Sequence, residues 1–96
     1  MSPENFKKLK ELRKKLDILD NSFIRLIKKR SILVEKVLSL KQNKNEIVDK
    51  KRIKIILTQI RKKSIKNNID PKITNRIWKN MIWSYIDFER RKFKKK

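Results

Sequence analysis

Apolar side chains recur every three or four residues along the N-terminal part of the chain. The series comprises Leu9, Leu12, Leu16, Leu19, Phe23, Leu26, Leu33, Val37 and Leu40. This alternation is the heptad pattern of a long helix with an apolar stripe. Arg30 interrupts the stripe, and a guanidinium within an apolar surface is costly unless an anion meets it. The pattern therefore predicts either a buried ion pair or snorkelling side chain at Arg30, or an anion-binding site inside a helical bundle.

Three helical segments are predicted, and no strand pattern is present, so the expected fold is all-α. The first helix runs from about Glu4 to about Lys41, and the polar stretch Gln42 to Glu46 is expected to form a loop. Asp49 can cap a second helix, which ends near Asn67 and Asn68. The third helix begins at Asp70-Pro71, where Asp is a favoured N-cap and Pro is favoured in the first turn.

The third helix carries two neighbouring rows of mostly apolar side chains. These rows are Ile73, Ile77, Met81, Tyr85 and Phe88, with Trp78, Ile82, Ile86 and Glu89 beside them. The remaining residues, 91–96, are expected to form a basic tail. The chain, residues 1–96, is expected to be a single helical domain.

Chain length argues for an oligomer. A chain of 96 residues buries only a modest fraction of its surface when it folds alone, and the first helix would exceed about 50 Å. Arg13 and Arg30 are about 25 Å apart along one such helix, too far to grip one small molecule. If two stripes pack antiparallel in a C2 homodimer, Arg13 of one chain approaches Arg30 of the other. Lys41 returns to nearly the face of Arg30, and Arg52 adds a cation near a positive helix end.

Composition changes how the charge is interpreted. The formal net charge of +20 is a possible nucleic-acid footprint. However, Gly, Cys, His and Ala are absent while Lys, Ile and Asn are abundant, as is typical of a genome biased towards A and T. Much of the charge then forms a solvated coat. A basic helical nucleic-acid binder stays an alternative, with affinity falling steeply with salt, but the distinct cations in or beside the apolar stripe argue against nucleic acid as a partner.

The missing residue types also exclude classes of chemistry. Without Cys and His there are no thiol nucleophiles, imidazole bases or usual zinc ligands, so we expect neither a metal nor a cofactor. No apolar run approaches the ~20 residues of a membrane span, and Met1 to Lys15 lacks the apolar core of a signal peptide. These features predict a cytoplasmic protein with no membrane partner.

A set of short motifs, in a fixed order, covers nearly the whole chain. They are Leu12-Arg13, Leu16-Asp17-Ile18-Leu19-Asp20, Lys29-Arg30, Lys41, Val48-Asp49-Lys50-Lys51-Arg52, Ile69-Asp70-Pro71 and the segment from Met81 to Phe93. In order and spacing they resemble the all-helical, AroQ-class chorismate mutases, together with the related isochorismate pyruvate lyases. The resemblance implies three helices per chain and an interlocked homodimer whose long first helices are shared between two active sites.

The resemblance also implies roles for individual residues. Arg13 of one chain and Arg30 of the other would bind the two carboxylates of chorismate, which rearranges to prephenate without a nucleophile. Lys41 would hydrogen-bond the ether oxygen and a carboxylate, so it would stabilise the negative charge that grows as the C–O bond breaks. Asp49 would sit by the ring hydroxyl, and Arg52 would support the carboxylate end.

Three positions depart from the familiar bacterial mutases. Ile53 stands where a Glu commonly bonds the ring hydroxyl, Tyr85 replaces a serine, and Glu89 replaces a glutamine that donates to the ether oxygen. An apolar residue at 53, Tyr at 85 and a short loop after Lys41 also occur in the pyruvate lyases, which form salicylate. The mutase is the favoured prediction, because prephenate is needed wherever phenylalanine and tyrosine are made.

Structural explanations stay open for several of these residues. Asp49 is equally an N-cap, Tyr85 a packing residue and Arg52 a solvated helix residue, while Trp78 and Trp83 are expected to pack.

Overall fold

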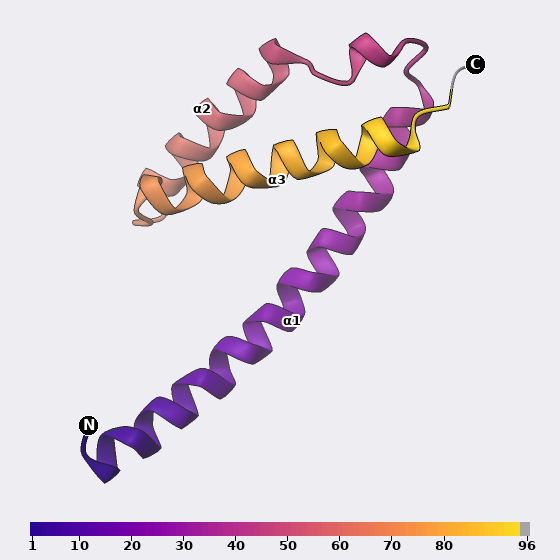
Figure 1. Cartoon of the computed structure of the whole chain (residues 1–96). Coiled ribbons are helices and arrows are strands. Elements are labelled where there is room, and N and C mark those ends of the chain that lie inside the picture. The colour runs from indigo at the N-terminus through magenta and orange to yellow at the C-terminus, as the bar shows by residue number, and fades with distance from the viewer. Residues whose placement is uncertain (95–96) are drawn as a thin grey trace. The chain divides into compact units, whose positions relative to one another are not determined.

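The computed structural model describes residues 1–94 of the chain, and three helices account for most of them (Figure 1). They are α1 (Pro3–Ser39), α2 (Lys50–Lys66) and α3 (Pro71–Lys92), with a short 3₁₀ helix, η1 (Lys44–Glu46), before α2. No strand occurs within residues 1–94. The predicted all-α fold with a long first helix is therefore confirmed.

The end of α1 differs from the prediction. The helix stops at Ser39, and the N–H groups of Leu40 and Lys41 donate to the carbonyls of Val37 and Leu38, each at 3.0 Å. Such bonds three residues apart tighten the last turn of a helix. The sequence predicted that Lys41 returns to the helix face of Arg30. Because Lys41 lies beyond the end of α1, helical periodicity does not apply to its side chain.

The chain divides into two compact units, Met1–Leu33 and a second unit from Val34 onward. Within the first unit, the apolar stripe of α1 faces solvent. Its members Leu12, Leu16, Leu19, Phe23 and Leu26 are between 56% and 58% exposed. Arg30 is also exposed, so a single chain does not supply the burial that was expected around it.

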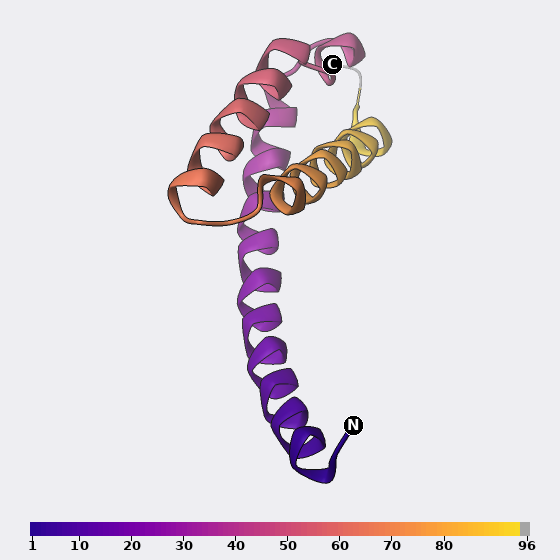
Figure 2. The same ribbon diagram turned by 90° about the vertical axis from the view of Figure 1, so that its left-hand side faces the viewer.

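The second unit holds the apolar core. Four buried residues form it: Leu38 from the last turn of α1, Ile47 after η1, and Ile82 and Ile86 from α3. Val48, Ile53, Ile56, Leu57 and Phe93 pack against these four. Helices α2 and α3 lie side by side in this unit (Figures 1 and 2).

A short loop, residues 67–70, joins α2 to α3 (Figure 2). The buried Ser64 hydroxyl lies 2.7 Å from the Thr74 hydroxyl, and the N–H of Ile69 donates to the Ser64 carbonyl at 2.9 Å. Asn68 adopts φ 57°, the left-handed conformation that asparagine tolerates at helix ends. Asp70 then caps α3 by accepting from the Lys72 N–H at 2.9 Å, as predicted.

Helix α3 buries one of its two predicted rows. Ile82, Ile86 and Glu89 are buried, whereas Ile73 and Ile77 are 55% and 49% exposed. The helix continues through Arg91 and Lys92, so these first two residues of the predicted tail are helical. Positions 95 and 96 of that tail lie outside the described residues.

Candidate active site

Lys41 and Glu89 form a part-buried ion pair within the second unit. The Nζ of Lys41 lies 3.3 Å from the Oε1 of Glu89, and the two side chains are 17% and 8% exposed. Glu89 belongs to the buried row of α3, and Lys41 follows the last turn of α1. Two residues that the sequence singled out for catalysis therefore lie together, although 48 positions separate them.

The backbone around Lys41 is held on both sides by buried residues. On the N-terminal side, the Lys41 N–H donates to the carbonyl of Leu38, whose side chain is in the core. On the C-terminal side, Ile47 is 3% exposed and packs in the same core. Lys41 is thus tethered to the core that also carries the row of Glu89.

Glu46 organises the loop between the buried residues Leu38 and Ile47. Its Oε2 accepts hydrogen bonds from the N–H groups of Gln42 and Asn43, both at 2.7 Å. The bonds from Asn43 and then Gln42 hold the pKa of the Glu46 carboxyl below its ordinary value. The polar sequence of this stretch predicted only a loop. The spacing of Asn43 and Glu46, three residues apart before a helical turn, is the capping-box signal that would have found it.

A hollow of about 590 Å³ lies beside this loop. It is lined by Lys41, Glu46, Val48, Asp49, Lys50 and Lys51. Asp49 is also the N-cap of α2, because its Oδ1 accepts from the Arg52 N–H at 3.0 Å. The structural explanation of Asp49 is therefore confirmed, and the same residue lines a hollow with Lys41.

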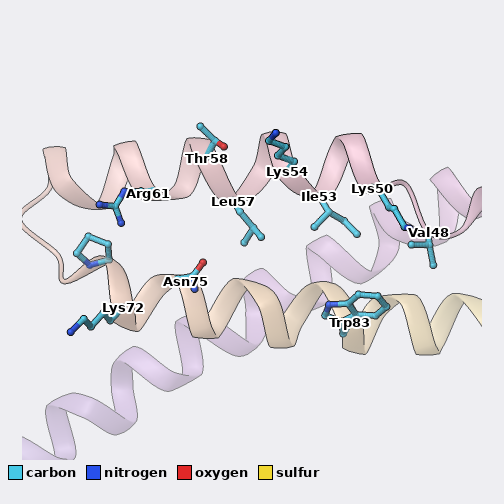
Figure 3. Close-up of a pocket in the computed structure, with 11 residues that line it drawn as sticks. Val48, Lys50, Ile53, Lys54, Leu57, Thr58, Arg61, Lys72, Asn75 and Trp83 are labelled. Carbon is cyan, nitrogen blue, oxygen red and sulfur yellow. The ribbon is translucent and has the colours of Figure 1, made fainter.

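A second hollow runs between α2 and α3 and is shown in Figure 3. Ile53 and Leu57 project from α2 towards α3, and Trp83 lies on the facing helix. Four cations also line it: Lys50, Lys54, Arg61 and Lys72. Of the predicted site residues, only Ile53 lines this hollow. Of the two tryptophans expected to pack, Trp78 is half-buried and Trp83 is 52% exposed in the single chain.

The other predicted residues are distributed over both units. Tyr85 is half-buried one turn before Glu89 on α3, and Arg52 is exposed in the first turn of α2. Arg13 and Arg30 are exposed on α1 and belong to the Met1–Leu33 unit. The structure brings Lys41 together with Glu89 and Asp49, and it keeps both arginines of α1 accessible.

Residues 1–94 contain neither a cluster of metal ligands nor a membrane-spanning helix. Over residues 1–94, His, Cys, Asp and Glu side chains nowhere gather in threes as ligands for a metal ion. None of the helices described combines the length and apolarity needed to cross a bilayer.

Comparison with known proteins gives two matches in sequence. Residues 12–90 match the family model for chorismate mutase type II. A chorismate mutase from Methanocaldococcus jannaschii is 37% identical over 76 residues, which cover 78% of this chain and 77% of that protein. No solved structure matches the chain significantly.

Proposed function

Because the chain belongs to the chorismate mutase type II family, we propose that it rearranges chorismate to prephenate at a site built around Lys41 and Glu89. The observation that carries this site is the part-buried pair itself, with Nζ and Oε1 3.3 Å apart. The family predicted from the sequence motifs is confirmed, and both matches favour the mutase over the pyruvate lyase. The role in phenylalanine and tyrosine biosynthesis follows from the family, and on the same ground we place the reaction in the cytoplasm.

The reaction suits the side chains that the chain possesses. Chorismate is a dianion, and its rearrangement breaks one C–O bond and forms one C–C bond within the same molecule. It needs no nucleophile, so a chain without Cys and His can catalyse it. Negative charge grows on the ether oxygen in the transition state, and the Lys41 ammonium is placed to stabilise it there more than in the substrate.

Glu89 supplies a second hydrogen-bond donor in its protonated form. An ionised carboxylate only accepts hydrogen bonds, so it would repel the developing charge on the ether oxygen. In the structure Glu89 accepts from Lys41. In the proposed complex, the substrate takes over the Lys41 ammonium, and the Glu89 carboxyl carries a proton that it donates to the ether oxygen.

The remaining groups of the site come from two chains in this proposal. Arg13 of one protomer and Arg30 of its partner bind the two substrate carboxylates, since the planar guanidinium suits bidentate pairing. The exposure of both arginines and of the apolar stripe on α1 supports this arrangement.

The rim of the site is assigned to residues of α2, α3 and the loop. Asp49 lies by the ring hydroxyl, and Arg52 supports the carboxylate end. Ile53 and Tyr85 contact the ring. Asp49 is supported by its place in the hollow with Lys41.

Product analysis tests the reaction. Purified protein is supplied with chorismate and isochorismate separately, and the products are separated by chromatography. We expect prephenate from chorismate and no salicylate from isochorismate. If isochorismate yields salicylate and pyruvate while chorismate yields no prephenate, the protein is a pyruvate lyase and the proposed mutase activity is wrong.

Assembly is tested by sedimentation. Because α1 exposes its apolar stripe, we expect an obligate homodimer of about twice 11.8 kDa. Leu19→Lys places a charge in the stripe and should abolish the folded dimer. Ile18→Lys is the matched control, since Ile18 is 65% exposed and lies outside the stripe; it should remain dimeric. A stably folded wild-type monomer at micromolar concentration would refute the prediction.

A further inference from the structure

We propose that Glu46 is a positioning residue for this reaction: its carboxylate clamps the backbone that directly follows Lys41 and thereby fixes the Lys41 ammonium in the site. The inference rests on the proposed function, because it acts through Lys41. None of the sequence motifs that resemble the family includes Glu46.

The clamp acts on the two peptide groups next to Lys41. A single carboxylate oxygen, Oε2 of Glu46, accepts from both the Gln42 and the Asn43 N–H at 2.7 Å. These N–H groups follow the end of α1, where a helix would no longer supply them with partners. With the Lys41 N–H bonded to Leu38, three consecutive peptide N–H groups around Lys41 have defined acceptors.

The clamp is itself attached to the core. Backbone bonds from Glu46 N to Asn43 O and from Ile47 N to Lys44 O close the η1 turn. Ile47 then inserts its side chain beside Ile82 and Ile86, on the α3 face that carries Glu89. The Lys41 backbone and the Glu89 side chain are therefore anchored to the same packed core. This common anchor fixes the distance between two groups that act on one oxygen.

Glu46 lines the hollow with Lys41, so two other roles must be distinguished from positioning. A direct substrate contact is disfavoured, because the Oε2 of Glu46 already accepts from two backbone N–H groups. A purely electrostatic effect on Lys41 would depend on the charge of Glu46, whereas the clamp depends on its oxygen atom. Glu46→Gln separates these, since the amide oxygen can accept both N–H groups without carrying a charge.

The experiment compares Glu46→Ala, Glu46→Gln and a matched control, Asp70→Ala. Asp70 is likewise an exposed carboxylate that accepts a backbone N–H at a helix start, but it caps α3 at the far turn. We expect Glu46→Ala to lower kcat about tenfold with little change in KM, and Glu46→Gln to stay within about twofold of wild type. Asp70→Ala should lower Tm by a similar amount to Glu46→Ala while leaving kcat unchanged.

A double-mutant cycle with Lys41→Ala shows whether the effect passes through Lys41. If it does, Glu46→Ala causes no further loss of kcat in the Lys41→Ala background. A further tenfold loss of kcat in the Lys41→Ala background would overturn the positioning role of Glu46 but not the proposed function. An equal loss of kcat in Glu46→Ala and Glu46→Gln would do the same. A wild-type protein that forms no prephenate would overturn the proposed function, and with it this inference.

Discussion

We expect Arg13→Ala and Arg30→Ala each to lower kcat/KM by at least about 10²–10³-fold, and we expect a mixture of the two proteins to regain activity after subunit exchange. Each single variant lacks one guanidinium in both sites of its homodimer, so one substrate carboxylate loses its bidentate partner. A mixed dimer has one site with both arginines and one with neither. Equal mixing makes about half of the dimers mixed, so we expect about a quarter of wild-type activity.

Two controls make this result specific. Arg13→Ala mixed with the Arg13→Ala/Arg30→Ala double variant forms no complete site and should stay inactive. Arg25→Ala removes another exposed cation of α1, one that donates to Ser22 at 3.0 Å, and should keep wild-type activity alone. Absence of recovery, when mass-tagged chains prove that exchange occurred, would remove the shared-site arrangement.

The helices could be predicted because their signals are local. Asp49 and Asp70 are caps whose side chains bond the N–H groups two or three residues later, and both caps are confirmed. Helix α1 ends before its predicted end at about Lys41, for a physical reason. Leu40 continues the apolar spacing, but the backbone is no longer helical there. The apolar pattern therefore extends beyond the last residue of the helix.

The packing of α3 could not be predicted in the same way. Its sequence offers two rows, and the one with Ile73 and Ile77 is the more uniformly apolar. The structure instead buries the row of Ile82, Ile86 and Glu89, because Leu38 and Ile47 meet α3 on that side. The contact of Glu89 with Lys41 depends on this choice of face, which periodicity alone leaves open.

The candidate site shows a similar division. The family resemblance indicated Lys41 and Glu89, whereas Glu46 lies in a polar stretch for which the apolar pattern predicts only a loop. Its two hydrogen bonds are short-range in sequence and were available to prediction. By contrast, the pairing of Arg13 with Arg30 concerns two chains and stays a prediction.

Replacing Glu89 should show whether its side chain donates a hydrogen bond to the ether oxygen. In our proposal the Glu89 carboxyl is such a donor. Glu89→Gln supplies an amide donor of similar shape. We expect it to keep substantial activity. Glu89→Ala should be about 10²–10³-fold impaired, as expected when one preorganised donor is removed.

Measurement of kcat/KM at neutral pH for the three proteins tests this prediction. The clamp of Glu46 is intact under these conditions: the pKa of Glu46 is lowered, so the clamp weakens only as pH falls below the ordinary range of a glutamate. Asp87→Asn is the matched control, because Asp87 lies two residues before Glu89 but is exposed and paired with Arg91 at 3.4 Å. It should keep the wild-type kcat/KM. A Glu89→Gln protein as impaired as Glu89→Ala would rule out the donor role of Glu89 and leave Lys41 as the donor to the ether oxygen.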